Sequence, residues 1–189
     1  MSKAALILIP IGIIIVLIIG AIGIYNGLVS SQEEAKTAWA QVENQYQRRA
    51  DLIPNLVETV KGYAQQEKSV LEEVTRLRSQ WGEARKSGDI NKTLEAASGL
   101  DAALGRLMVV VERYPDLKSN QNFMKLQDQL EGTENRISVE RRRYNEVVLS
   151  YNKKIRTFPG AMLAGFFGFE RMPLFEAEEK AKKAPAVKF

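Results

Sequence analysis

The stretch FMKLQDQLEGTENRISVERRRYNEVVLSYNKKIRTF, residues 123–158, decides the fold of this chain. A large apolar or aromatic side chain stands at every seventh position, and Leu126, Thr133 and Val147 stand three residues further on. The seventh-residue positions are Phe123, Leu130, Ile137, Tyr144, Tyr151 and Phe158. This repeat is typical of a coiled-coil seam that packs against other helices. A helix over residues 119–157 would be about 58 Å long, which predicts the spine of an elongated bundle rather than a small globule.

Three more helical segments precede this one, over residues 26–50, 53–85 and 91–112, and strand-like runs are missing from the sequence between residues 26 and 157. The turns Ser87-Gly88-Asp89 and Tyr114-Pro115-Asp116 separate the later segments. Four helices of similar length pack best in up-down-up-down order. The predicted fold is therefore all-α: an antiparallel up-and-down four-helix bundle over residues 26–157. Its predicted seam includes Trp39, Tyr46, Leu130, Ile137, Tyr144 and Tyr151.

Pro54 leaves one turn of this topology open. It either kinks one continuous helix or occupies the first turn of a new helix that Asp51 caps. We favour the new helix and a turn near residues 50–54, because a continuous helix of about 60 residues would reach roughly 90 Å and stay mostly uncovered. With four helices, the last one returns toward the start of the first.

Residues 4–24 carry no charge and consist almost entirely of aliphatic residues and glycine. Such a segment spans about 31 Å, the thickness of a bilayer core. A cleaved signal peptide is the alternative, with Ala21-Ile22-Gly23 as its cleavage site, but the apolar run is longer than such peptides use. We expect residues 1–25 to be an uncleaved, single-pass anchor that contacts the lipid bilayer. Representative anchor residues are Ala4, Ile9, Ile14, Ile19 and Ile24.

Flanking charge predicts the orientation of this anchor. Lys3 and the α-amino group precede it, whereas Lys36 is the only Lys or Arg between the anchor and Arg48. Positive charge stays on the cytoplasmic side, so we expect a cytoplasmic N-terminus. In a bacterium, the protein would sit in the inner (cytoplasmic) membrane with its body in the periplasm or outside the cell. The absence of Cys excludes disulfides and a lipidated cysteine.

The C-terminal residues 158–189 form a third segment, which begins with FPGAMLAGFFGF over residues 158–169. This run is apolar and aromatic but rich in Gly, and helix parity brings it back to the membrane side of the bundle. We expect oligomer or membrane contact through Phe158, Phe166, Phe167 and Phe169. The alternative is that these rings plug the open end of the bundle. Gly23 and Gly27 form a GxxxG pair at the membrane exit, a weak signal for helix association.

The composition excludes several chemistries. With no His and no Cys, neither a Ser-His-Asp or Cys-His arrangement nor an ordinary zinc site can form, and no phosphate-binding Gly-rich loop occurs. Glu67, Asp101 and Glu140 lie near the apolar stripes, but di-metal sites in helix bundles also need His. We expect no metal and no cofactor, and interpret these carboxylates as partners of Arg48, Arg49, Arg76 or residues 141–143.

Two further patterns have modest interpretations. Outside the anchor, 26 Lys and Arg face 23 Asp and Glu, a net charge of +3, and the run Arg141–Arg143 has no aromatic platform beside it. We therefore expect no nucleic-acid partner. The pair Tyr-Asn occurs at residues 25, 144 and 151, and we interpret the two later Asn side chains as hydrogen-bonding partners of a neighbouring helix.

Taken together, these segments resemble the LemA family over most of the chain. The matching stretches are YNGLV (25–29), Trp39, RRADLIPNLVETVKGYAQQE (48–67), YPDLKSNQNF (114–123), ENRISVERRRYNEVVLSYNKKIRTFP (134–159), GFFGF (165–169) and FE (175–176). The resemblance implies a bacterial, membrane-anchored four-helix bundle. It implies no enzyme activity, and the link of some members with membrane remodelling or organelle formation suggests a scaffold.

Two functions from different classes follow from these observations. The first is a non-enzymatic, homo-oligomeric scaffold at the bacterial membrane, favoured by the apolar tail and the long seam. The second is a monomeric accessory or receptor module that binds a peptide or a membrane protease, with other membrane proteins as partners. The mass of the protein in mild detergent separates the two.

Overall fold

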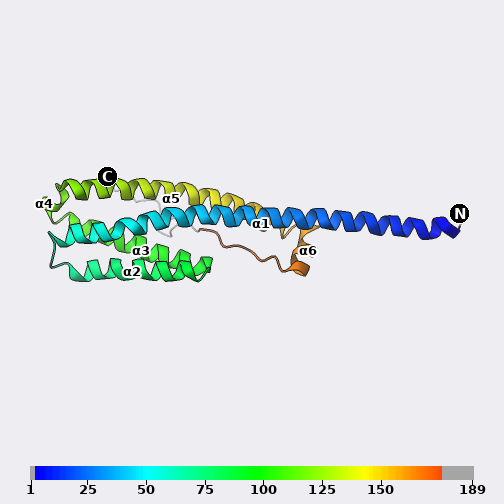
Figure 1. Cartoon of the computed structure of the whole chain (residues 1–189), viewed down its shortest axis with the longest axis horizontal. Coiled ribbons are helices and arrows are strands. Elements are labelled where there is room, and N and C mark those ends of the chain that lie inside the picture. Colours follow the sequence, from blue (N-terminus) through cyan, green and yellow to red (C-terminus); the bar gives the residue numbers. More distant parts are fainter. Residues whose placement is uncertain (1–2, 176–189) are drawn as a thin grey trace, which may run out of the picture. The chain divides into compact units, whose positions relative to one another are not determined.

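The computed structural model describes the backbone of residues 3–175 and the side chains from residue 8 onward. Every regular element in this part of the chain is helical (Figure 1), which confirms the all-α prediction for it. The helices are α1 (Lys3–Lys61), α2 (Lys68–Lys86), α3 (Ile90–Val111), α4 (Pro115–Lys118), α5 (Gln121–Lys154) and α6 (Gly160–Phe167).

Local sequence sets several helix ends. The carboxylate of Asp89 accepts hydrogen bonds from the backbone N–H groups of Asn91 and Lys92 at the start of α3, and Gly88 before it has φ +70°. The amide oxygen of Asn120 does the same for Asn122 and Phe123 at the start of α5. Short polar side chains at these positions satisfy N–H groups that have no partner within the helix. The predicted turns at residues 87–89 and 114–116 are confirmed, the second holding the short helix α4.

The predicted turn near Pro54 is wrong, because α1 continues through it to Lys61. Proline has no N–H, so the carbonyl oxygen of Ala50 loses its usual partner within the helix. The Nε–H of Arg78 in α2 donates to this oxygen at 2.7 Å and replaces the lost hydrogen bond. The chain turns instead over residues 62–67, where the N–H of Glu67 donates to the carbonyl of Ala64.

The described chain divides into two compact units. One comprises residues 3–39 and Arg143–Leu174, and the other comprises Ala40–Arg142 and Phe175. Helices α1 and α5 each contribute one part to the first unit and the other part to the second. We call the first the tail unit, because it contains the aromatic tail. We call the second the charged unit, because it contains the ion network described below.

The charged unit has a core of large buried side chains from α1, α2, α3 and α5. Trp81 of α2 lies 6.3 Å from the Tyr46 ring of α1, measured between ring centroids. Helix α2 packs along α3, and Leu100 and Leu107 of α3 are fully buried. Ile137 of α5 is likewise fully buried.

The seventh-residue repeat in α5 is buried for its first five members, from Phe123 to Tyr151. The sixth, Phe158, is 80% exposed, so the seam does not extend to it. The reason is that α5 ends at Lys154, four residues earlier, and the helical period ends with it. In the second half of α5, Val148 is buried where the pattern favoured Val147, which is half-buried.

Candidate functional site

Helix α1 begins with an apolar segment whose side chains are exposed until its last turn, where Ile24 packs on a neighbouring cluster. Ile9, Ile14 and Ile19 are 52%, 54% and 64% exposed. The side chain of Ala4 lies outside the described residues. By length and composition, α1 is the one described helix that is able to cross a membrane. Added Cβ atoms at Gly23 and Gly27 would meet nothing within 4 Å, so the predicted GxxxG face is open.

Next to this segment, the chain after α5 folds back onto α1. Leu28 of α1, Tyr151 and Ile155 from the end of the α5 region, and Ala164 of α6 form a buried apolar cluster. Four partly buried side chains pack against it: Ile24, Leu163, Phe169 and Met172. A Cβ at Gly160 would collide with the carbonyl oxygen of Lys154, so glycine is what lets α6 begin this close to α5. Part of the tail therefore packs on a core within its own unit.

The other face of α6 is uncovered. Met162 and Phe166, one helical turn apart, are 69% and 80% exposed, and Phe158 just before the helix is equally exposed. Phe167 is half exposed, and its ring centroid lies 4.7 Å from that of Tyr25 on α1. The four predicted contact residues thus separate: Phe169 packs inward, Phe158 and Phe166 face outward, and Phe167 lies between. We call Phe158, Met162, Phe166 and Phe167 the outer α6 face.

Beyond α6, the chain is extended and lies against α5. Gly168, at φ +73°, turns it out of the helix. The hydroxyl of Tyr151 donates to the carbonyl oxygen of Glu170 at 2.8 Å, and that of Tyr144 donates to the carbonyl oxygen of Pro173 at 2.9 Å. Between them, the Asn152 amide donates to the carbonyl oxygen of Met172 at 2.9 Å and accepts from its N–H at 3.0 Å. We call Tyr144, Tyr151 and Asn152 the tail clamp.

Burial shapes the acid–base behaviour of the tail clamp. Tyr144 is fully buried, which raises the pKa of its phenol to about 12, because the charged phenolate would lose its hydration. Burial also raises the pKa of Tyr151. Both phenols are therefore neutral hydrogen-bond donors over the physiological pH range. The Asn152 side chain was expected to bind a neighbouring helix, and this was wrong: its partner is the backbone of the tail.

The charged unit contains an ion network around Asp101 of α3. Arg49 of α1, which is 5% exposed, bonds to the carboxylates of Asp101 and Glu134, and Arg141 lies 3.0 Å from the second oxygen of Asp101. Arg141 also donates to the Tyr46 hydroxyl. The predicted pairing of Asp101 with arginines is confirmed. Glu67 pairs instead with Arg113 and Tyr114, residues that the sequence analysis did not propose.

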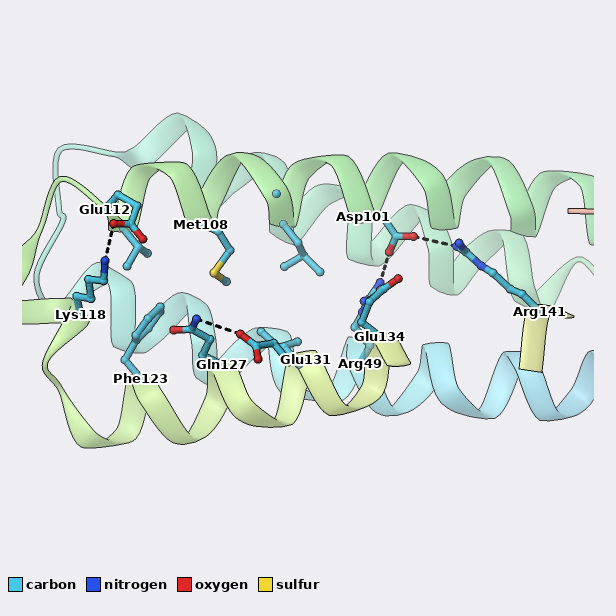
Figure 2. A pocket seen from close by; sticks show the side chains of 14 residues that line it. Arg49, Asp101, Met108, Glu112, Lys118, Phe123, Gln127, Glu131, Glu134 and Arg141 are labelled. Carbon is cyan, nitrogen blue, oxygen red and sulfur yellow. Dashed lines mark hydrogen bonds and ion pairs between the residues drawn. The ribbon is translucent and has the colours of Figure 1, made fainter. Parts of the chain in front are cut away.

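This network forms one end of a pocket of about 540 Å³. Figure 2 shows Asp101 between Arg49 and Arg141, while Met108 and Phe123 line the other end with the Glu112–Lys118 ion pair. The described residues contain no cluster of three or more potential metal-binding side chains. Arg49, Asp101, Glu134 and Arg141 at one end of the pocket, and Glu112 and Lys118 at the other, are ion-paired with one another.

Several of these contacts were not predicted. The Arg78–Ala50 bond and the Asn152–Met172 pair join residues 28 and 20 positions apart. The recurrence of Tyr-Asn at a spacing of seven was the available signal for the tail clamp, since it places both Tyr residues on one side of a helix. It did not identify the partner, because the bonded atoms of the tail belong to its backbone.

The helical fold, the apolar start of α1 and the aromatic tail define a class of protein. It is a helical protein with one segment that is long and apolar enough to cross a membrane. The chain belongs to the LemA family, whose profile matches residues 38–189. It is 31% identical over 186 residues to the magnetosome protein MamQ 2 of Paramagnetospirillum magneticum, covering 86% of this chain and 68% of that protein. MamQ of Magnetospirillum gryphiswaldense is 30% identical with the same coverage. Protein LemA of Metamycoplasma hominis is 28% identical over 160 residues, covering 84% of this chain and 71% of that protein.

Proposed function

We propose that this protein is a non-enzymatic, membrane-anchored scaffold that assembles into a homo-oligomer. In this proposal, the four long helices form an antiparallel up-and-down bundle, and the apolar segment of α1 is its single-pass anchor. The observation that carries the proposal is the outer α6 face. It exposes a group of large apolar side chains directly beside the residue where the apolar segment of α1 ends.

An exposed aromatic group of this kind marks a contact with lipid or with another protein. Burying the side chains of Phe158 and Phe166 alone is worth on the order of 3–6 kcal/mol before ordering costs. Exposed ion pairs on this chain, such as Lys36–Glu33, contribute at most about 1 kcal/mol each. The apolar contact therefore outweighs any surface charge contact in holding an assembly together.

A non-enzymatic role has two supports. The chain has no His or Cys, and the carboxylate best placed for chemistry, Asp101, is held by two arginines. The relatives named above carry names that describe no reaction, and two of those names assign the relatives to the magnetosome. We carry over to this chain only the idea of a protein that builds a cellular structure.

The mass of the full chain in mild detergent tests this function. A scaffold gives a closed particle of many 21.2 kDa chains, which imaging of single particles would resolve. The variant to compare with the parent carries both Phe166→Ser and Met162→Ser. These two changes keep α6 while removing the apolar area of its outer face. Only one chain per micelle for the parent would end the proposal.

The proposed location is the bacterial inner membrane, with the N-terminus in the cytoplasm and the helical body on the other side. The support is the charge difference between Lys3 and the long stretch after the anchor, which has Lys36 alone before Arg48. A reporter enzyme fused after Phe189 should be active only outside the cytoplasm. Activity confined to the cytoplasm would reverse the assignment.

The alternative function is a monomeric module that binds a peptide, and the pocket in the charged unit favours it. This pocket combines an apolar end at Met108 and Phe123 with a charged end at Arg49 and Glu134. Such a combination suits a segment with one apolar and one charged side chain. The same mass measurement separates the scaffold from this alternative, since one chain per micelle supports the monomeric peptide-binding module.

A further inference from the structure

The tail clamp makes hydrogen bonds to the backbone of the tail. Four hydrogen bonds join Tyr144, Tyr151 and Asn152 to carbonyl oxygens or the N–H group of Glu170, Met172 and Pro173. These bonds hold the extended segment that follows α6 in Figure 1 by its backbone, while the side chains of Phe169 and Met172 pack on the buried apolar cluster beside it. The Asn152 amide, as donor and acceptor to one residue, repeats the pairing that a neighbouring strand would make.

The clamp side chains are held by packing within the tail unit. Tyr144 and Tyr151 are fully buried along one side of α5, and Trp39 packs on the Tyr144 ring with centroids 5.5 Å apart. Their hydroxyls are thus fixed in place, seven residues apart, with Asn152 beside the second. A preformed row of donors costs little further ordering when an extended peptide binds to it.

We infer that the tail clamp is a binding site for an extended peptide, and that in the assembly it binds residues 170–173 of a second copy. This inference rests on the proposed homo-oligomer. Each copy carries both the site and its ligand, so exchange replaces every hydrogen bond lost within a chain by the same bond between chains. The free energy of the new interface between the two copies then decides whether the tail binds to its own chain or to the second copy.

Two features of the tail unit favour exchange. The segment is joined to α5 only through residues 155–169, and the outer α6 face leaves Met162 and Phe166 uncovered while the tail stays in its own chain. Bringing a second copy against this region gives those side chains a partner. Anchoring in one membrane would also raise the local concentration of neighbouring copies, which favours binding between chains.

Chemical cross-linking of the full-length protein tests the exchange, because the chain has no Cys of its own. One tagged copy carries Lys153→Cys, beside Asn152, and a differently tagged copy carries Arg171→Cys, beside Met172. Both replaced side chains are exposed and outside the clamp. After co-expression, a short thiol-reactive cross-linker applied to membranes should join the two tags.

The matched control adds Asn152→Ala to the Lys153→Cys copy. Removing both bonds to Met172 should lower the yield between chains about fivefold or more. A yield that does not respond to Asn152→Ala overturns the inference, since it reports proximity alone. So does a cross-link that forms only within a chain carrying both cysteines. The mass in detergent separates this failure from that of the scaffold: a large particle without exchange leaves the scaffold intact, whereas a single chain rejects both.

Discussion

The tail unit and the charged unit are stabilised in opposite ways. In the charged unit, buried side chains from four helices surround an ion network in which Arg49 bonds to both Asp101 and Glu134. In the tail unit, apolar packing and hydrogen bonds hold an extended segment, while much aromatic surface remains uncovered. One unit pairs buried charges internally, and the other leaves large apolar side chains exposed.

This difference directs the tests of the proposed function to the tail unit. Exposed aromatic side chains beside an apolar helix have a cost in water that only a partner or a lipid surface removes. The four predictions below test the contrast, beginning with the largest effect.

The strongest test of the charged unit is Arg49→Ala. Removing this buried cation takes one arginine away from both Glu134 and Asp101, so we expect a loss of about 3 kcal/mol in the free energy of unfolding. Chemical unfolding in detergent, followed by circular dichroism, measures it. Glu134→Gln is the control and should cost less than about 1 kcal/mol, because Glu134 is half exposed. An equally small effect for Arg49→Ala would mean that the network does not stabilise the unit.

Alkaline pH should act on the tail unit through Tyr144. Its pKa is about 12 in the folded protein and 10.0 in an exposed phenol, so the unfolded chain loses this proton first. The contribution of Tyr144 is fully present below pH 10 and falls as pH rises to 12, by up to about 3 kcal/mol.

The Tyr144→Phe variant isolates this effect. Near pH 8 it should be less stable than the parent by about 1 kcal/mol, because the bond to Pro173 is lost. The difference should shrink and then reverse above pH 10. A constant difference from pH 8 to pH 12 would show that this phenol ionises equally in the folded and unfolded states.

Asn152→Ala should release the extended tail without unfolding the helices. Two hydrogen bonds to Met172 are lost, which is worth about 1–2 kcal/mol. We expect trypsin to cleave after Arg171 about five to thirty times faster, with an unchanged helix signal. Lys153→Ala, at the next and exposed position, serves as the control. Equal cleavage rates in the two variants would argue that apolar packing alone holds the tail.

The smallest stability effect is expected on the outer α6 face. Phe166→Ser should change the free energy of unfolding by less than about 0.5 kcal/mol, whereas Phe169→Ser, which removes packing on the buried cluster, should cost about 1–2 kcal/mol. Assembly or membrane binding should show the reverse order, with Phe166→Ser more harmful. If both variants behave alike in both assays, α6 does not have two distinct faces.

The sequence alone determined the features that repeat along a helix. The seventh-residue pattern from Phe123 to Tyr151 identified the buried side of α5, and the composition of residues 4–24 identified the apolar segment of α1. The caps at Asp89 and Asn120 follow from local chemistry. These features depend on neighbours within a few residues, which a sequence displays directly.

Only the tertiary structure decided the features that depend on a distant partner. Pro54 favours a helix start locally, yet α1 passes through it because Arg78 supplies the missing donor to Ala50. The tail divides into an inward Phe169 and an outward Phe166 because Gly160 and Gly168 set the path of the chain. A hydrogen bond acts on whichever group lies within about 3 Å, however far away it is in sequence. The order of residues therefore displays the donors of the tail clamp but not the backbone that they bind.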